Sequence, residues 1–213
     1  MRIVGIMPIK LNNERLPGKN TKLLGGKPLI QYALGEVLDS QMLDEMYVYC
    51  SSDEIAQYLP EGVQYLRRST ELDKPTSNFT QIFSSFMAEV DADIYVYAHA
   101  TAPFVSAETI RKCVESVKSG EYDSAFTATE IQDFLWQDGR PLNFDATNLP
   151  RSQDLKPIYR ESSGVYVFTA EVFRSLRRRV GMTPYIHKLN AREAVDINTM
   201  DDFHLAEVLL NSK

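Results

Sequence analysis

The chain has 213 residues, of which 44% are hydrophobic and 24% are charged, and its formal net charge is −6 at pH 7. This composition is typical of one folded domain that can bury a core without disulfides or structural metals. The acidic balance argues against nonspecific binding to nucleic acid or to an anionic membrane surface. The chain has two cysteines, Cys50 and Cys113, which exclude a disulfide scaffold and a cysteine-rich zinc site. Both lie in apolar runs and are expected to be buried free thiols.

No stretch approaches the roughly 20 apolar residues that span a bilayer. The first apolar run stops at Lys10, and no small-residue cleavage site follows it. This pattern favours a first strand over a signal peptide. We therefore expect a cytoplasmic protein that binds neither nucleic acid nor membranes.

Apolar runs rich in Val, Ile and Tyr alternate with segments of helical periodicity. In chain order, we expect a strand at Ile3–Ile9, a helix at Pro28–Leu38, a strand at Met46–Cys50, a short helix at Ser52–Tyr58, a strand at Val63–Leu66, a helix at Phe79–Val90, a strand at Asp93–Ala98, a helix at Ser106–Lys118, strands at Ser124–Thr129, Val165–Phe168, Tyr185–Leu189 and Ala194–Ile197, and a helix at Met200–Leu210. Asn78, Ser106 and Thr199 are the expected N-caps of three helices.

This alternation predicts an α/β fold with a mostly parallel sheet flanked by helices. Right-handed crossovers would bring the ends of Ile3–Ile9 and Asp93–Ala98 to the same edge, where such sheets bind ligands. Arg177–Arg179 is interpreted as a solvated helix end, and the less favoured alternative is a contact with an anion or nucleic acid.

The pattern breaks between residues 131 and 158, where turn signals and prolines accumulate. We interpret this stretch as a protruding arm within a single domain that covers residues 1–213. Phe134, Leu135 and Trp136 are apolar residues in this irregular stretch. They suggest a contact with a partner chain, because large exposed apolar patches are uncommon on monomers.

A basic loop follows the first expected strand and carries Lys10, Arg15, Gly18 and Lys19. Three cations and a flexible glycine can hold a triphosphate, since the charges neutralise it and backbone amides form an anion nest. The alternative is a solvated basic loop without a ligand. The sequence contains neither a P-loop motif nor G-x-G-x-x-G, which argues against a dinucleotide cofactor.

The same loop resembles a known signature. Arg15–Asn20 (RLPGKN) followed by Gly25–Ile30 (GGKPLI) resembles the N-terminal motif of the acylneuraminate cytidylyltransferase family. Further resemblances to this family follow in chain order at Cys50–Asp53, Arg67–Leu72, Ala98–Phe104, Arg151–Leu155 with Tyr159–Glu161, and Asp196–Thr199 with Asp202. Ordered matches along nearly the whole chain are much harder to obtain by chance than one.

The resemblance implies a nucleotide-diphospho-sugar transferase (Rossmann-like) fold with a protruding dimerisation arm. It implies an Mg²⁺-dependent enzyme that transfers CMP from CTP to an acidic keto-sugar, a nonulosonic acid such as sialic acid, and releases pyrophosphate. Such an enzyme would serve surface polysaccharide biosynthesis. It also implies a homodimer whose arms reach toward the neighbouring active site.

The resemblance also assigns roles to individual residues. It implies Lys19 and Arg15 as catalytic residues. For nucleotide binding it implies Pro8, Lys10, Arg15, Lys19, Asn20 and Arg68; for acceptor binding, His99, Thr101, Arg151, Gln153 and Tyr166; and for metal binding, Asp196 and Asn198. The implied chemistry is mostly positioning plus cationic stabilisation of phosphate oxygens, and it needs no covalent nucleophile.

Several positions depart from the family pattern. Asn198 replaces an aspartate, His99 replaces a glutamine, Lys10 replaces an arginine and Glu14 replaces a lysine. These departures keep two alternatives open: another acceptor, such as an eight-carbon keto-acid sugar or a phosphorylated small molecule, or a non-catalytic nucleotide-binding protein. Individual residues also have simpler interpretations. His99 could be a core histidine and Arg151 a surface ion-pair partner, while Asp196 could stabilise the following helix.

Overall fold

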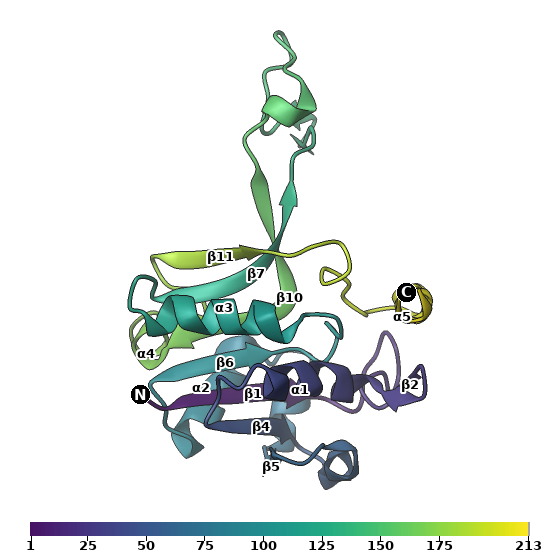
Figure 1. Cartoon of the computed structure of the whole chain (residues 1–213), viewed down its shortest axis with the longest axis vertical. Helices are drawn as coiled ribbons and strands as arrows, with labels where there is room; N and C mark the ends of the chain where they lie inside the picture. The colour runs from purple at the N-terminus through teal and green to yellow at the C-terminus, as the bar shows by residue number, and fades with distance from the viewer. Residues whose placement is uncertain (213) are drawn as a thin grey trace.

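Seven strands form one sheet in the computed structural model, which describes residues 1–212 (Figure 1). Their order is β11-β7-β10-β6-β1-β4-β5. The strands are β1 (Ile3–Ile9), β4 (Glu45–Cys50), β5 (Val63–Arg67), β6 (Ile94–Ala98), β7 (Ser124–Ile131), β10 (Ile158–Thr169) and β11 (Pro184–Lys188). Only β10 runs antiparallel to its neighbours, so the predicted mostly parallel sheet is confirmed.

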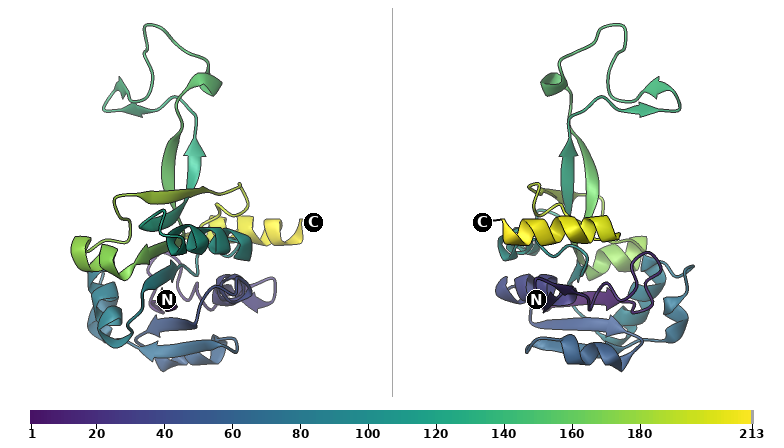
Figure 2. Two further views of the ribbon diagram at one scale, coloured as in Figure 1. Left: turned by 60° about the vertical axis from the view of Figure 1, so that its left-hand side comes forward. Right: turned by 90° about the vertical axis from the view of Figure 1, so that its right-hand side faces the viewer.

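Helices cover both faces of this sheet, as the sequence predicted (Figures 1 and 2). One face packs against α1 (Leu29–Asp39) and α3 (Ala107–Lys118), and the other against α2 (Phe79–Glu89) and α4 (Ala170–Leu176). Alternate residues of β6 serve the two faces, since Val96 belongs to the first core cluster and Tyr95 and Tyr97 to the second. The second cluster is aromatic, and such rings supply large apolar area in edge-to-face pairs.

The three predicted N-caps are confirmed. Asn78 and Thr199 each form a reciprocal capping box with the residue three positions later. The hydroxyl of Ser106 accepts a hydrogen bond from the backbone N–H of Thr109 at the start of α3. Each cap satisfies backbone donors that would otherwise lack partners at a helix start.

The last helix, α5 (Met200–Asn211), returns to the beginning of the chain. Its Phe203 and Ala206 are buried against Leu16, Leu24 and Leu29 of the segment that follows β1. That segment includes a small hairpin of β2 (Leu23–Leu24) and β3 (Lys27–Pro28). The packing therefore holds the C-terminal part of the chain beside the basic loop.

The stretch between residues 131 and 158 stands clear of the sheet (Figures 1 and 2). The ends of β7 and β10 pair at its base, and it carries two short strands, β8 (Trp136–Gln137) and β9 (Arg140–Pro141). Phe134 and Trp136 both pack edge-on against Phe144, with ring centroids 4.9 and 5.4 Å apart. Trp136 nevertheless remains 60% exposed, so the arm presents apolar surface to its surroundings.

Two expected elements differ from the structure. Ala194–Ile197 is not a strand, because the Asn190 side chain accepts hydrogen bonds from backbone N–H groups two and three residues later and starts a turn. The Ile197 N–H then binds the carbonyl of Thr101 rather than a strand neighbour. The helix expected at Ser52–Tyr58 is a 3-10 helix, Asp53–Tyr58; two further short 3-10 segments occupy Thr70–Asp73 and Ser152–Asp154.

Both cysteines are buried and free, as expected. Burial raises the pKa of the Cys113 thiol to about 12, so this side chain behaves as a small apolar group. Between residues 1 and 212, no helix combines the length and the apolarity that crossing a bilayer requires.

Candidate active site

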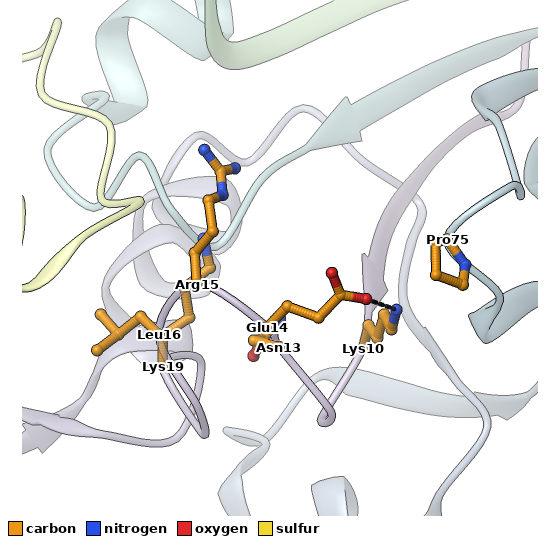
Figure 3. Close-up of a pocket in the computed structure, with 7 residues that line it drawn as sticks. All are labelled: Lys10, Asn13, Glu14, Arg15, Leu16, Lys19 and Pro75. Carbon is orange, nitrogen blue, oxygen red and sulfur yellow. Dashed lines mark ion pairs between the residues drawn. The ribbon is translucent and has the colours of Figure 1, made fainter.

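The carboxyl ends of the parallel strands carry most of the residues singled out by sequence. The residue directly after β1 is Lys10, the residue after β5 is Arg68 and the residue after β6 is His99. The loop after β1 forms a polar cleft of about 360 Å³ (Figure 3). Its lining comprises Lys10, Asn13, Glu14, Arg15, Leu16, Lys19 and Pro75. The predicted position of the basic loop at the ligand-binding edge is therefore observed.

The shape of this loop depends on two of its residues. Gly18 has φ +64°, a left-handed conformation that side-chain-bearing residues rarely adopt. The buried Asn20 donates from Nδ2 to the carbonyl of Lys10 at 3.0 Å and so closes the loop on itself. Asn20 thus shapes the predicted phosphate site from within, and its amide nitrogen is already engaged.

Lys19 is only 8% exposed, which is unusual for a lysine. Its Nζ donates to the backbone carbonyl of Ile197 at 2.9 Å and to Oδ1 of Asn198 at 3.4 Å. Burial lowers the pKa of the Lys19 ammonium, while the nearby carboxylate of Asp196 opposes this shift. A charge held in such surroundings acts more strongly on a bound phosphate than one in water.

Arg15 contacts the same Asn198 side chain as Lys19. Its guanidinium donates to Oδ1 of Asn198 at 2.8 Å, and the Asn198 amide donates to Oδ2 of Asp196 at 2.6 Å. The structure therefore brings together Arg15, Lys19, Asp196 and Asn198, although more than 175 residues separate the two pairs in sequence. A negative group placed at this junction would meet two cations.

The other oxygen of Asp196, Oδ1, is buried and has no hydrogen-bond partner among the described residues. A buried carboxylate oxygen without a partner is costly, and a cation is one group that could satisfy it. Oδ1 of Asn198, in contrast, already contacts two cationic side chains. Within residues 1–212, no group of three or more acidic, His or Cys side chains is placed so that it could hold a metal ion, so phosphate oxygens or water would have to complete a metal's coordination.

Asp202 has a structural role at the start of α5. Its Oδ2 accepts hydrogen bonds from the N–H groups of Asn198 and Thr199 and from the Thr199 hydroxyl. These donors lower the pKa of the Asp202 carboxyl. The same contacts fix the backbone of Asn198 at the start of α5.

Arg68 lies buried at the end of β5, and its guanidinium pairs with Asp73 at 2.6 Å. Its Nε is buried without a hydrogen-bond partner among the described residues. Motif matching did not identify Asp73, because nothing in the local sequence signals its pairing with Arg68. Pro8 lies near the end of β1, opposite Tyr49 of β4, and so forms part of the rigid frame beneath the basic loop.

His99 is half-buried between two tyrosines, with ring centroids 5.1 Å from Tyr97 and 6.0 Å from Tyr166. Burial, with the charge of Arg179, lowers the pKa of His99 to about 4, so the imidazole is neutral at pH 7. Its Nδ1 is buried and has no partner among the described residues. His99 is therefore packed among aromatic rings, as in the simpler interpretation, but it keeps a polar atom without a partner.

The remaining predicted acceptor residues are spread out. Thr101 anchors the Ile197 segment through its carbonyl, and Tyr166 is buried with its hydroxyl bound to Glu161 at 2.8 Å. Arg151 and Gln153 lie exposed in the arm, where Arg151 forms two hydrogen bonds to Asp154. Within one chain, the arm residues thus do not join the cluster around Lys19.

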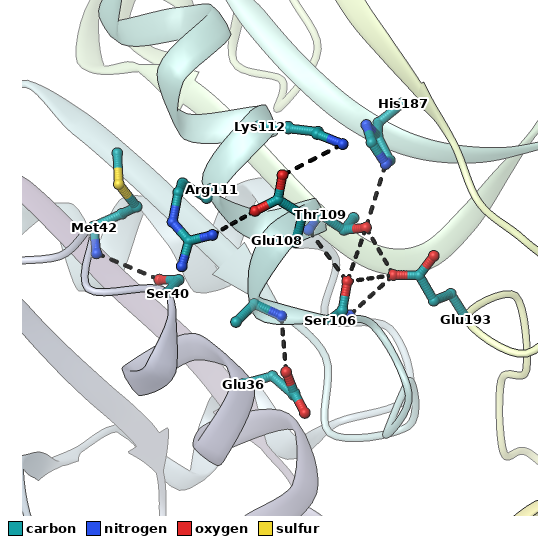
Figure 4. A network of polar contacts seen from close by, with 11 residues as sticks. Glu36, Ser40, Met42, Ser106, Glu108, Thr109, Arg111, Lys112, His187 and Glu193 are labelled. Carbon is teal, nitrogen blue, oxygen red and sulfur yellow. Dashed lines mark hydrogen bonds and ion pairs between the residues drawn. The ribbon is translucent and has the colours of Figure 1, made fainter. Parts of the chain in front are cut away.

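A polar network at the start of α3 holds the segment that carries Asp196 (Figure 4). The carboxylate of Glu193, three residues before Asp196, accepts hydrogen bonds from the backbone N–H and hydroxyl of Ser106 and from the Thr109 hydroxyl. Burial opposes ionisation of Glu193, but these donors keep the pKa of its carboxyl lowered. No motif pointed to Glu193, and its contact with the start of α3, 87 residues earlier, left no signal in the sequence.

The buried imidazole predicts a pH dependence of stability. The unfolded chain binds a proton to His99 near pH 6.5, whereas the folded chain does so only near pH 4. The neutral imidazole therefore makes its full contribution to the free energy of unfolding above pH 6.5. This contribution, up to about 3 kcal/mol, is lost as the pH falls toward 4. His99→Gln should flatten this loss in urea unfolding curves recorded between pH 4 and 7. The exposed His204→Gln is the control; equal slopes for both variants would refute the assignment.

Comparisons with known proteins agree with this geometry. An N-acylneuraminate cytidylyltransferase of Oncorhynchus mykiss is 28% identical over 96% of this chain, although the chain spans only 49% of that relative. A CMP-N,N'-diacetyllegionaminic acid synthase of Legionella pneumophila is 29% identical, with 99% of this chain and 97% of the relative covered. A pseudaminic acid cytidylyltransferase of Campylobacter jejuni is 24% identical, with 98% and 96% covered. The chain thus spans about half of some relatives and nearly all of others.

Solved structures confirm the predicted nucleotide-diphospho-sugar transferase fold. CMP:2-keto-3-deoxy-manno-octonic acid synthetase in complex with CTP superposes with a TM-score of 0.72 at 16% identity, covering 99% of this chain and 98% of the other. A 4-diphosphocytidyl-2C-methyl-D-erythritol synthase from Anaerococcus prevotii superposes with a TM-score of 0.71 at 14% identity, with 99% of each chain covered. The sequence model of the family described as "Cytidylyltransferase" matches residues 4–208, and the chain belongs to this family.

Proposed function

We propose that this chain transfers CMP from CTP to an acidic keto-sugar of the nonulosonic acid class and releases pyrophosphate. The observation that carries the proposal is the convergence of Arg15 and the buried Lys19 on Asp196 and Asn198 at the carboxyl edge of the sheet. The names of the three relatives, which act on acylneuraminic, legionaminic and pseudaminic acids, support the class of acceptor.

The reaction forms one bond and breaks one bond. A sugar hydroxyl oxygen attacks the α-phosphorus of CTP, the bond from that phosphorus to the pyrophosphate oxygen breaks, and the hydroxyl proton is lost to solvent or to a nearby base. Negative charge builds up on the phosphate oxygens as the pyrophosphate leaves. Lys19 and Arg15 oppose that charge with fixed positive groups that need not reorganise.

We propose Mg²⁺ as the cofactor, held by Asp196 through its unpartnered Oδ1. When bound, Mg²⁺ would neutralise phosphate charge and help orient the triphosphate. Asn198 would act as a positioning residue, since its amide holds Asp196 from one side and its Oδ1 accepts from Arg15 and Lys19 on the other. This arrangement needs only one protein carboxylate at the metal.

Lys19→Met tests the nucleotide site. It should lower kcat/KM for CTP by about 100- to 1000-fold, because a buried cation that faces the phosphates is lost. Pyrophosphate release with CTP measures this effect, screened over several nonulosonic acids, an eight-carbon keto-acid sugar and a no-acceptor control. Lys22→Met is the matched control, since Lys22 lies on the same loop with its ammonium over the Phe203 ring.

Two results would contradict the proposal. Equal use of CTP and GTP would exclude a cytidine-specific enzyme. CTP binding without pyrophosphate release from any acceptor would favour the non-catalytic alternative.

Asp196→Asn tests the metal. We expect the Mg²⁺ concentration for half-maximal rate to rise about 10- to 100-fold, since the variant removes the negative charge of the proposed ligand. Asp201→Asn, at an exposed position in the first turn of α5, is the control and should leave this value unchanged. Full activity in EDTA, or an unchanged Mg²⁺ dependence of the Asp196 variant, would remove Mg²⁺ from the mechanism.

We further propose a homodimer in which the arm of one chain completes the acceptor site of the other. The support is the exposed Trp136 and the placement of Arg151 and Gln153 away from the Lys19 cluster of their own chain. A chain that lacks residues 132–148 should sediment as a monomer, while the exposed Leu205→Ala on α5 should leave the association unchanged. A shortened chain that stays dimeric would contradict the role of the arm in dimerisation.

A further inference from the structure

Two clefts of opposite charge flank β10 on the side of the candidate site. One, of about 590 Å³, is lined by Glu161, Asp196 and Asp202 with a single cation, Arg160. The other, of about 410 Å³, is lined by Arg177–Arg179 with a single carboxylate, Glu161. The sequence analysis interpreted Arg177–Arg179 as a solvated helix end. The structure agrees for exposed Arg177, which caps α4, but not for Arg179.

Arg179 is packed into the wall of the basic cleft. Its guanidinium carbon lies 3.7 Å from the centroid of the Tyr166 ring, and its NH2 group donates to the Tyr166 hydroxyl at 2.9 Å. The same nitrogen lies 3.5 Å from Oε2 of Glu161, whose side chain is 51% exposed. Stacking on an aromatic face holds a guanidinium flat and leaves its edge available to a carboxylate.

This cleft adjoins the cluster around Lys19 through His99. The Tyr166 ring that supports Arg179 also contacts the His99 ring, with centroids 6.0 Å apart. Two residues after His99, the carbonyl of Thr101 accepts a hydrogen bond from the Ile197 N–H, and Lys19 binds the carbonyl of the same Ile197. A molecule that reaches from Lys19 across His99 would meet Arg179 next.

The charge of the cleft suits an anion. Arg177 and Arg178 form no ion pair with any residue between 1 and 212. Within the same residues, the only ion pair of Arg179 is with the half-exposed Glu161. Three guanidinium groups against one carboxylate leave a local excess of positive charge on an acidic protein. The acidic cleft on the other side of β10 would repel an anionic ligand unless a cation were bound there.

We infer that Arg179 is the specificity-determining residue that binds the carboxylate of the acidic keto-sugar, with Glu161 as the internal carboxylate that the acceptor displaces. This inference rests on the proposed transfer reaction and names the group that selects its acceptor. Arg179 lies outside every segment that resembles the family motifs. A bidentate contact between guanidinium and carboxylate would orient the sugar with its reacting end toward His99 and Lys19.

The test compares an acid with its neutral analogue. N-acetylneuraminic acid and its methyl ester are supplied to the wild type, Arg179→Gln and Arg179→Lys. The glutamine variant should raise the KM for the acid about 10- to 100-fold and leave the ester and CTP within about twofold, because a charged hydrogen bond to the carboxylate is lost. The KM of Arg179→Lys for the acid should lie between those of the wild type and Arg179→Gln, since lysine keeps the charge but not the planar fork. If Arg179→Gln does not fold, the comparison of Arg179→Lys with the wild type tests the inference.

The control is Arg174→Gln, which removes an exposed arginine of α4 that pairs with Asp91 outside the cleft. Its KM values should match those of the wild type. An equal loss for acid and ester in Arg179→Gln would reduce Arg179 to a structural role and overturn the inference. An unchanged KM for the acid would do the same.

Calorimetric binding of the acid to the CTP-loaded protein separates this inference from the proposed function. Binding that is weakened by Arg179→Gln, without turnover of any acceptor in the wild type, would support Arg179 while refuting the transfer reaction. Turnover with no preference of the wild type for the acid over the ester would refute the role of Arg179 alone. Absence of both binding and turnover would refute both.

Discussion

The site depends on one long-range contact, the hydrogen bond from the buried Lys19 ammonium to the carbonyl of Ile197. This bond joins the loop after β1 to the segment before α5, 178 residues later. Removing either partner would leave a buried polar group without compensation, so the two segments stabilise each other. The apolar packing of Phe203 and Ala206 on Leu16 and Leu24 supports the same junction from below. The charge proposed for catalysis and the contact that joins the two segments thus belong to the same side chain, Lys19.

The alternation of apolar runs was sufficient to predict the order and type of most elements, because strands buried on both faces and helices with one apolar face leave clear periodic patterns. β1 was predicted to the residue, and the helix caps at Asn78, Ser106 and Thr199 followed from short local chemistry. Ala194–Ile197 was predicted wrongly because Val and Ile in a short run signal a strand, whereas the Asn190 side chain starts a turn there. Side-chain hydrogen bonds of this kind compete with strand pairing and leave no periodic trace.

The candidate site was only partly predictable. The motifs identified Arg15, Lys19 and Asp196, whose spatial convergence the structure then supplied. They did not identify Asp73, Glu193 or Arg179, since each acts through a partner that is distant in sequence or unremarkable by type. The ionisation of His99 was also beyond the sequence, because its pKa depends on how Tyr97 and Tyr166 remove the imidazole from solvent. Local chemistry can be seen in a sequence, whereas burial and long-range pairing cannot.

The network around Glu193 affects how the site moves. Residues 189–199 form no strand ladder, so few backbone hydrogen bonds resist their detachment from the domain. The bonds from Ser106 and Thr109 to one carboxylate therefore resist local opening of this segment, together with the bond from Lys19 and the burial of Ile197. Amide hydrogens there would exchange with solvent through local opening, while those of β1 and β6 would require unfolding of the whole sheet. The segment that carries Asp196 is thus attached to the domain mainly by side-chain contacts and not by strand pairing.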